Sequence, residues 1–451
     1  MSAGGAHLRF PDGFSWGVSA SAFQIEGALA DDGRGPSVWD TFCARPGNIA
    51  NDDDPGRACD HYHRWREDVA LIGGLGVDAY RFSIAWPRIQ PSGRGAPNQA
   101  GLDHYARLVD ALLERGIAPV PTLYHWDLPQ ALQDAGGWHN RDTCERFADY
   151  VQHVARRLGD RVPRWITHNE TFEHAVLGHA LGTHAPGEAH GLGIFDVVHH
   201  LLLSHGRAVQ VLRATARADA QVGIAQSLQR ARPASKRLRD RAAAWLLDTV
   251  HDRMHVDPLL LGRYPRGLAL LRQDRSALRD GDLATIAQPL DFLGINFYNP
   301  QYVRMAPRGS AAPIEEAEPP ARFERTEMGW PVDATGLGEV LHGLRARYGK
   351  RLPPILVTEN GAAFPDALDG QGRIDDPRRI DYLQKHLAEL RRAIDAGIDV
   401  RGYFVWSILD NFEWAEGYRP RFGLVHVDYA SQRRTPKASY HWYREQIAAQ
   451  R

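Results

Sequence analysis

The sequence lacks the charge excess and the long apolar segments that mark nucleic-acid-binding, membrane or secreted proteins. Its 54 Lys and Arg residues nearly balance 55 Asp and Glu residues, giving a formal net charge of -1 and no field that would attract nucleic acid or an anionic membrane. No run of about 18 apolar residues occurs, and residues 1–10 show no basic segment followed by an apolar one, so neither a membrane helix nor a secretory signal is expected. We predict a cytoplasmic protein with a small, uncharged partner.

Cysteine is also scarce. The three cysteines, Cys43, Cys59 and Cys144, offer no disulfide framework, so we expect buried thiols in a reducing compartment. A content of 43% hydrophobic and 24% charged residues is typical of a globular protein with a large core. Length alone would permit several domains, but no repeat or low-complexity linker divides the chain, and we expect one domain over residues 1–451.

Short apolar or β-branched runs alternate with helix-like segments rich in Arg, Ala and Leu. This alternation is typical of parallel strands joined by crossover helices, and eight such strands predict closure into an α/β fold, the (β/α)8 or TIM barrel. A stretch rich in Pro, Ala and Glu, residues 306–320, follows the sixth run and predicts a loop-like insertion. The eight runs are residues 14–21, 78–84, 118–126, 164–169, 222–229, 292–298, 354–361 and 400–407.

Polar and aromatic side chains follow the apolar part of most of these runs. The carboxyl ends of all strands of a (β/α)8 barrel converge on one face, where the active site is built. Residues that are far apart in the sequence are therefore expected to meet there. The side chains that follow this rule are Gln24, His125, Asn169, Glu170, Tyr298, Glu359, Asn360 and Trp406.

Two glutamates at strand ends are candidates for catalysis. Glu170 ends the segment Trp-Ile-Thr-His-Asn-Glu, and Glu359 lies in Ile-Leu-Val-Thr-Glu-Asn-Gly. On its own, a glutamate at a strand end is more often a solvated rim residue. As a pair, the two would supply the nucleophile and the proton donor for cleavage of a glycosidic bond with retention, which requires carboxyl groups about 5 to 5.5 Å apart.

Ordered motifs occur along nearly the whole chain, from residue 10 to about 443. They favour a catalytic role for the two glutamates over the interpretation as solvated rim residues. They include Phe-Pro-Asp-Gly-Phe-Ser-Trp-Gly at 10–17, Gln-Ile-Glu-Gly at 24–27, Tyr-Arg-Phe-Ser-Ile at 80–84 and Tyr-His-Trp-Asp-Leu-Pro at 124–129. Asn-Phe-Tyr at 296–298, Thr-Glu-Asn-Gly at 358–361 and Trp-Ser-Ile-Leu-Asp-Asn-Phe-Glu-Trp at 406–414 follow. With these motifs the chain resembles glycoside hydrolase family 1, the β-glucosidase family.

The resemblance implies a role for each catalytic residue. Glu359 is the expected nucleophile and Glu170 the acid/base, while Asn169 bonds the 2-hydroxyl of the sugar. Arg81 and Tyr298 are expected to keep Glu359 ionised. The pKa of Glu170 should be raised in the free enzyme and should fall once Glu359 becomes an ester.

The resemblance also implies a binding site for an unphosphorylated glycoside, with no cofactor and no metal. Trp406 is the expected platform under the sugar ring, and the acidic segment around Glu413 and Glu416 should repel a sugar phosphate. Taken singly, a tryptophan near a strand end is usually core and a lone histidine usually structural. The expected substrate-binding residues are Gln24, His125, Trp126, Asn296, Trp330, Trp406, Glu413, Trp414 and Phe422.

The chain departs from the family pattern beside the acid/base glutamate. Thr171 stands where proline is usual, and His168 where an apolar residue is commoner, so the acid/base loop is expected to sit differently. The stretch that lines the aglycone side in relatives is unusually polar here, which favours a specialised aglycone, such as that of a secondary metabolite, over cellobiose. Its polar or aromatic members are Phe172, Glu173, His174, His179 and His184.

Several alternatives stay open. Irregular spacing argues against metal ligation by the local histidines and favours solvated or aglycone-facing side chains. Transglycosylation and a non-catalytic sugar-binding role are the alternatives to hydrolysis. Glucoside, galactoside and fucoside are not distinguished, nor are monomer and homodimer. The histidines concerned are His168, His174, His179, His184 and His190.

Overall fold

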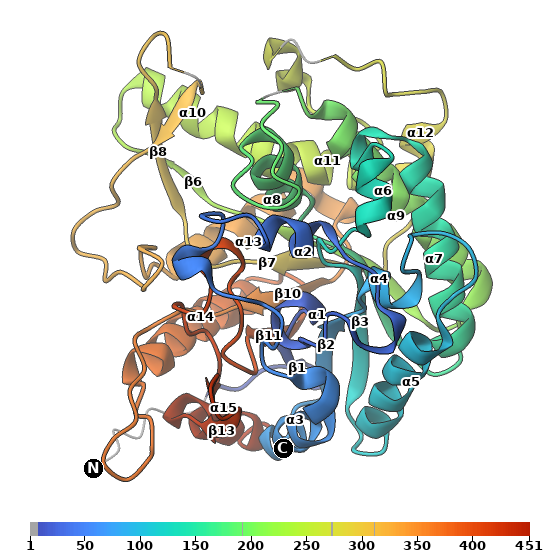
Figure 1. Cartoon of the computed structure of the whole chain (residues 1–451). Coiled ribbons are helices and arrows are strands. Elements are labelled where there is room, and N and C mark those ends of the chain that lie inside the picture. Colours follow the sequence, from blue (N-terminus) through green and yellow to red (C-terminus); the bar gives the residue numbers. More distant parts are fainter. Residues whose placement is uncertain (1–7, 192, 272–273, 311) are drawn as a thin grey trace.

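A closed barrel of eight parallel strands forms the centre of the molecule, in the order β1-β11-β10-β7-β5-β4-β3-β2. This computed structural model describes residues 8–191, 193–271, 274–310 and 312–451 (Figure 1). The (β/α)8 prediction is confirmed, and each predicted run corresponds to one barrel strand. The strands are β1 (Ser15–Ser19), β2 (Ala79–Ser83), β3 (Ala118–Tyr124), β4 (Arg164–Asn169), β5 (Gln221–Ser227), β7 (Phe292–Asn296), β10 (Ile355–Asn360) and β11 (Val400–Trp406).

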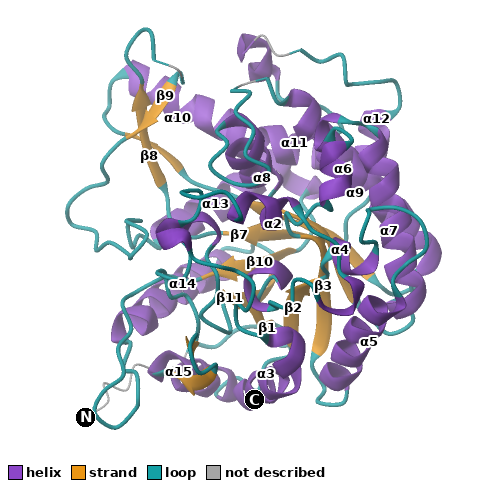
Figure 2. Cartoon of the chain, in the orientation of Figure 1, coloured by secondary structure: helices purple, strands orange, loops and turns teal. Residues whose placement is uncertain are grey.

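Helices surround the barrel (Figure 2). In α7 the buried side chains Phe147, Val151, Val154 and Leu158 recur every three or four residues, so one face of the helix packs inward. The long helices are α3 (His61–Leu75), α5 (Gln99–Leu113), α7 (Asp142–Leu158), α9 (Phe195–Thr215), α13 (Thr335–Tyr348), α14 (Pro377–Asp395) and α15 (Ala438–Ala448). Among the described residues, no helix combines the length and the apolar character needed to span a membrane.

Shorter elements occupy the connections between the strands and these helices. They are α1 (Ala22–Ile25), α2 (Val38–Cys43), α4 (Trp86–Ile89), α6 (Gln130–Asp134), α8 (Thr171–Ala175), α10 (Leu238–Leu247), α11 (Met254–Leu261) and α12 (Asp282–Ile286). A two-stranded antiparallel hairpin, β12 (Val425–Asp428) and β13 (Arg433–Pro436), precedes α15.

Packed side chains fill the barrel interior. Phe404 projects from β11 toward β1, where a Cβ on Gly17 would lie 2.3 Å from the ring, so only glycine fits at that position. The barrel is therefore a solid core with no pore, and a binding site can form only beyond the strand ends. The interior cluster is Ala79, Val120, Ile166, Ala225, Phe292, Leu356 and Phe404.

The register of the strands aligns the predicted site residues at one end of the barrel. Asn169 pairs with Ala225 across β4 and β5, and Ser227 pairs with Asn296 across β5 and β7. Asn296 in turn pairs with Glu359 across β7 and β10. Residues more than about fifty positions apart in the sequence thus become neighbours at the carboxyl ends.

The predicted loop at residues 306–320 contains a strand, so this expectation is wrong in part. β9 (Ile314–Glu316) pairs antiparallel with β8 (Gln301–Met305), which also pairs with β6 (Ala231–Pro233) (Figure 2). The Pro-rich composition indicates turns, whereas the strand forms by antiparallel pairing with the nearby strand β8. Ala311, within this stretch, lies outside the described residues. Residues 1–7 also lie outside them, and these residues were part of the basis for expecting no secretory signal.

The cysteines are unpaired, as their number predicts. Cys59 and Cys144 are buried, and burial raises the pKa of both thiols. Cys43 is only partly buried because it ends α2 near the surface. The expectation of three buried thiols is therefore wrong for Cys43.

Candidate active site

A cavity of about 310 Å³ lies at the carboxyl ends of the barrel strands. Glu170 and Glu359 both line it, so the two carboxyl groups address the same space. The other predicted site residues in its wall are His125, Trp126, Tyr298, Trp330, Trp406, Glu413, Trp414 and Phe422. Four further predicted residues, Gln24, Arg81, Asn169 and Asn296, lie behind the wall and bind groups that line it.

Glu359 lies in β10 and is 3% exposed. Arg81 donates from Nη1 to Oε1 at 2.6 Å, and the hydroxyl of Tyr298 donates to Oε2 at 2.6 Å. Burial raises the pKa of Glu359 above its usual value, and the positive charge of Arg81 and the hydrogen bond from Tyr298 offset only part of this rise. Both oxygens of Glu359 therefore have a strong donor that favours the carboxylate form.

Glu170 follows β4 directly, and its backbone adopts the left-handed region with φ at 49°. Its amide donates to the carbonyl oxygen of Ala225 at 2.8 Å, and Asn296 donates from Nδ2 to Oε1 at 2.8 Å. Burial, the charge of Glu359 and the charge of Glu173 raise the pKa of Glu170 well above its usual range. Because Glu170 has only an amide donor and Glu359 has Arg81, Glu170 keeps the proton of the pair.

Asn169 connects the two carboxyl groups. Its Oδ1 accepts from Arg81 Nη2 at 2.5 Å and from Asn296 Nδ2 at 3.0 Å, and its Nδ2 donates to His125 Nε2 at 3.0 Å. His125 Nε2 is then the acceptor, which places the ring hydrogen on Nδ1, an atom without a protein partner among the described residues. Burial lowers the pKa of His125 well below its usual range, so this ring is a neutral donor in the cavity wall.

Aromatic side chains form the rest of the wall. Trp406 and Phe422 belong to one buried cluster, against which Trp330 packs. Trp414 lies 4.7 Å from Trp126 between ring centroids. An indole face can cover the weakly apolar face of a sugar ring, so both groups are suited to a carbohydrate.

The cavity is lined by carboxyl groups. Glu413 receives a hydrogen bond from Gln24 Nε2 at 3.4 Å, and its pKa is raised to about 8 by burial, the charge of Glu359 and the charge of Glu416. No Lys or Arg is among the described residues that line the cavity. An anionic substituent would therefore meet no compensating charge inside it. The lining carboxyl groups are Glu170, Glu173, Glu316, Glu359, Glu413 and Glu416.

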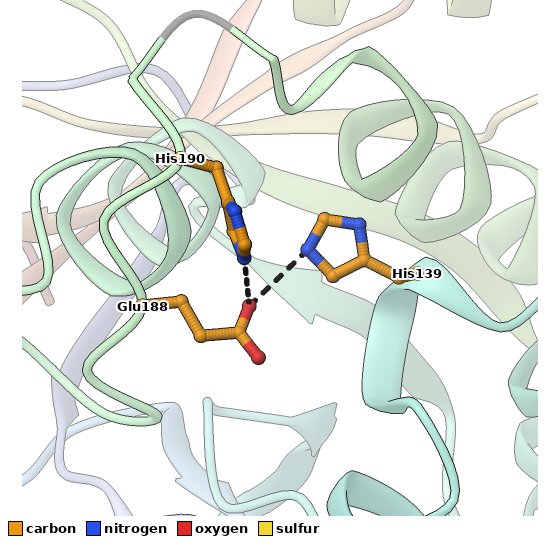
Figure 3. Close-up of side chains that lie close together, drawn as sticks. All are labelled: His139, Glu188 and His190. Carbon is orange, nitrogen blue, oxygen red and sulfur yellow. Dashed lines mark hydrogen bonds and ion pairs between the residues drawn. The ribbon is translucent and has the colours of Figure 1, made fainter.

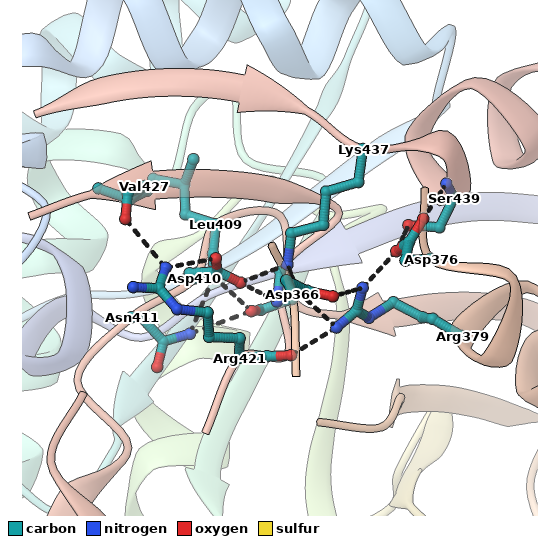
Figure 4. A network of polar contacts seen from close by, with 12 residues as sticks. Asp366, Asp376, Arg379, Leu409, Asp410, Asn411, Arg421, Val427, Lys437 and Ser439 are labelled. Carbon is teal, nitrogen blue, oxygen red and sulfur yellow. Dashed lines mark hydrogen bonds and ion pairs between the residues drawn. The ribbon is translucent and has the colours of Figure 1, made fainter. Parts of the chain in front are cut away.

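A buried ionic network supports the loop that carries Glu413, Trp414 and Phe422 (Figure 4). Asp410 accepts from Lys437 at 2.7 Å, from Arg421 at 2.9 Å and from the amide of Gly423 at 2.9 Å. Next to Asp410, the side chain of Asn411 accepts from Gln24. These bonds bracket the loop at both ends and fix the side chains that it presents to the cavity.

The structure places the polar stretch after Glu170 in two environments. Glu173 and His184 line the cavity as expected, whereas His174 and His179 are buried outside it. His174 contacts the hydroxyl of Tyr124 at 3.1 Å, and His179 contacts Glu188 at 2.7 Å.

His168 is also buried, and the hydroxyl of Ser204 lies 2.9 Å from its Nε2. The expectation of solvated or aglycone-facing histidines is therefore wrong for His168, His174 and His179. Each ring has a hydrogen-bond partner from another part of the fold, namely Ser204 for His168, Tyr124 for His174 and the partly exposed Glu188 for His179, which sequence spacing could not indicate. Thr171 is likewise anchored: its hydroxyl lies 2.9 Å from Gln226 Oε1 and 2.7 Å from His255 Nδ1.

Several lining residues were missed by the sequence analysis. Ser227 and Gln229 end the fifth run and follow the strand-end rule, so the signal for them was present. Gln301 and Glu316 come from β8 and β9, whose approach to the cavity depends on tertiary structure. The remaining missed residues are Leu177, Asn299 and Met328.

A closed (β/α)8 barrel in which two buried carboxyl groups, unequal in their donors, share one cavity at the strand ends is the architecture of a glycoside hydrolase. A sequence profile described as glycosyl hydrolase family 1 matches residues 6–451, and the chain belongs to this family.

Relatives extend over the same length. The chain is 46% identical to β-glucosidase A of Acetivibrio thermocellus, with 98% of each chain covered. It is 45% identical to a bifunctional β-D-glucosidase/β-D-fucosidase of Bifidobacterium breve, again with 98% of each covered. The solved structure of β-glucosidase from Thermotoga maritima in complex with deoxynojirimycin superposes with a TM-score of 0.93 at 43% identity, covering 98% of this chain and 99% of that one.

Proposed function

We propose that this enzyme is a β-glucosidase that hydrolyses terminal, unphosphorylated β-D-glycosides by double displacement, with Glu359 as nucleophile and Glu170 as acid/base. The observation that carries the proposal is the unequal pair of carboxyl groups in one cavity. Glu359 is held by Arg81 and Tyr298, while Glu170 is held by Asn296 alone. A carboxylate and a carboxylic acid are thus present together, as the first step requires.

In the first step, an oxygen of Glu359 bonds to the anomeric carbon while the bond to the leaving oxygen breaks. Glu170 gives its proton to that oxygen, so the aglycone leaves as a neutral alcohol. The ester neutralises Glu359, which removes a charge that raises the pKa of Glu170. Glu170, now a carboxylate, takes a proton from water as the water attacks the anomeric carbon, and Glu359 leaves as the free carboxylate.

The sugar is held by side chains that the same cavity presents. We assign Trp406 as the platform under the ring and Asn169, locked by Arg81 and Asn296, as the partner of the 2-hydroxyl. We expect His125 and the carboxyl group of Glu413, which both line the cavity, to bind the outer hydroxyls. The names of the relatives support glucose as the sugar, and the Bifidobacterium enzyme makes fucosides the second sugar to test.

We expect phosphorylated sugars to be rejected, because the described cavity lining offers a phosphate no basic side chain. A 6-phosphate would enter a cavity whose described lining includes Glu413 and Glu416 and no basic side chain. We expect p-nitrophenyl β-glucoside to be hydrolysed with a far higher kcat/KM than its 6-phosphate. A preference for the phosphate would refute this part of the proposal.

The aglycone side favours a polar leaving group. Glu173 lines the cavity, accepts from the hydroxyl of Ser227 at 3.1 Å and pairs with His251 at 3.5 Å. The pKa of His251 is raised to about 9, despite its burial, by hydrogen bonds to Asp252 and Glu173. We expect aryl glucosides with polar substituents to be better substrates than cellobiose, and comparable activity on both would count against specialisation.

The roles of the two glutamates are tested with a panel of aryl β-glycosides on the wild type, Glu359→Ala and Glu170→Ala. Loss of Glu359 should remove hydrolysis of every substrate, because the carboxylate that attacks the anomeric carbon is gone. Loss of Glu170 should spare substrates with good leaving groups, which need little protonation. Equal loss on all substrates for both variants would overturn the assignment. Product analysis with added alcohols separates hydrolysis from transglycosylation.

A further inference from the structure

Three potential metal ligands converge outside the catalytic cavity, on the surface beside α9 (Figure 3). His139 ends the short helix η3 (Gly137–His139), whereas Glu188 and His190 lie in the segment between η4 (Val176–Ala180) and α9. The ligand atoms of these three residues all lie within 4.8 Å of one another. All three side chains are partly exposed, so an ion could reach them from solvent.

The spacing of the ligand atoms fits tetrahedral coordination. His139 Nε2 lies 3.2 Å and His190 Nε2 3.5 Å from Glu188 Oε2. Ligands at the usual zinc distances of about 2.0 to 2.1 Å stand about 3.3 to 3.4 Å apart in a tetrahedron. The two distances to Glu188 Oε2 lie within about 0.2 Å of this value, and all three ligand atoms lie within 4.8 Å of one another.

The residues around the cluster orient its ligands. Asp196 accepts from His139 Nδ1 at 2.7 Å, which leaves the lone pair of Nε2 for an ion. Gln133 donates to Glu188 Oε1 at 2.8 Å, and His179 contacts Oε2 at 2.7 Å. A carboxylate behind a ligating histidine is a recurrent arrangement in zinc sites and distinguishes this cluster from a chance grouping of surface charges.

We propose that His139, Glu188 and His190 form a binding site for a divalent transition-metal ion of the zinc type, with water in the fourth position. Two imidazoles and one carboxylate suit Zn²⁺, Co²⁺ or Ni²⁺ and are a poor set for Ca²⁺ or Mg²⁺, which prefer oxygen ligands. The ion would replace the hydrogen that now joins His139 to Glu188. This site is separate from the glycosidase chemistry and needs no step of it.

The bound ion would restrain the segment of residues 184–190, which forms part of the rim of the catalytic cavity. His184 precedes Glu188 in the same segment, lines the cavity and lies 5.3 Å from Trp39 and 6.0 Å from Trp126 between ring centroids. A metal bond from this segment to His139 would fix it against η3. Stability toward heat and the affinity for bulky aglycones should both respond to the ion.

The test is a titration of chelator-treated full-length enzyme with ZnCl2 in competition with a chromophoric chelator. We expect one equivalent to bind, and His139→Ala and His190→Ala each to weaken the affinity at least about 30-fold. His342→Ala, an exposed histidine on α13, is the matched control and should bind as the wild type does. Equal affinity of the wild type and the His139→Ala/His190→Ala double variant would overturn the proposal.

Two readouts separate a site from loose surface binding. In isothermal titration calorimetry, ZnCl2 should give a saturable heat of one equivalent with the wild type and none with the His139→Ala/His190→Ala double variant. Zinc at 100 times Kd should raise Tm by roughly 2 to 4 °C in the wild type and not in His190→Ala. Absence of both effects, with circular dichroism unchanged, would reject the site.

Discussion

The floor and the rim of the cavity are built by different means. The floor consists of Glu359 together with the barrel-strand side chains directly behind it, Arg81, Asn169 and Asn296, and all four are buried and bonded to one another. The rim consists of side chains from the connections, among them Glu316, which is exposed. Polar groups that are buried and mutually bonded cannot move without losing several bonds at once. The floor is therefore fixed for chemistry, and the rim is free to vary with the aglycone.

The comparison is sharpest at the nucleophile. Glu359→Gln keeps the shape of the floor but removes the attacking charge, so kcat/KM should fall by about 10⁴-fold or more. Glu316→Gln makes the same chemical change on the rim and should alter kcat/KM by less than about threefold. Steady-state kinetics with p-nitrophenyl β-glucoside measures both, and circular dichroism checks that each variant is folded. Similar losses of kcat/KM in the two variants would contradict the distinction between a fixed floor and a variable rim.

Removal of the acid/base should reduce activity to an extent that depends on the leaving group of the substrate. For Glu170→Ala we expect a loss of about 10³-fold on alkyl glucosides and about tenfold or less on 2,4-dinitrophenyl glucoside, which leaves without protonation. Added azide, which can attack the glycosyl-enzyme without base assistance, should restore turnover of the activated substrate. A uniform loss that azide does not relieve would assign the proton to another group.

The hydrogen bond from Tyr298 should be visible in the pH profile. Its donation to Glu359 stabilises the carboxylate, so Tyr298→Phe should raise the pKa of Glu359. Glu359 must be ionised to attack, and the acid limb of kcat/KM should therefore move to higher pH, by about one unit. Tyr302→Phe, in β8 and outside the cavity lining, is the control. An unmoved acid limb would contradict the account of Glu359.

The smallest shift of the pH profile is expected for a change at Glu173, a rim carboxylate whose charge acts on the acid/base Glu170. The charge of Glu173 raises the pKa of Glu170, so Glu173→Gln should lower that pKa and move the basic limb to lower pH, by less than about half a unit. KM for polar aryl glucosides should change by about two- to fivefold. If kcat on 2,4-dinitrophenyl glucoside changed by more than tenfold, Glu173 would act in the chemistry together with the floor residues, contrary to this account.

The difference between floor and rim also decides what the sequence could predict. Strand ends converge by geometry, so Glu170, Glu359 and Trp406 could be placed in one cavity from the alternation of runs alone. The motifs added Arg81 and Asn296, whose side chains reach the site from behind its wall. Both kinds of inference depend on the barrel, which the pattern of eight runs indicates directly.

The rim could not be predicted in the same way. Glu316 reaches the cavity because β9 pairs with β8, a contact between segments whose composition suggested only a loop. His174 and His179 lie in the stretch that includes cavity residues, yet both are buried outside the cavity, where they contact Tyr124 and Glu188. Such orientations depend on tertiary partners that local sequence does not reveal.

The central claim is that Glu359 forms the covalent bond to the sugar. It is tested most directly by incubating the enzyme with 2,4-dinitrophenyl 2-deoxy-2-fluoro-β-D-glucoside, which forms the glycosyl-enzyme but releases it slowly, followed by mass spectrometry of the digested protein. We predict one sugar per chain, attached to Glu359. Attachment to Glu170 or to any other residue, or turnover of the ordinary substrate with no trapped ester, would contradict the mechanism.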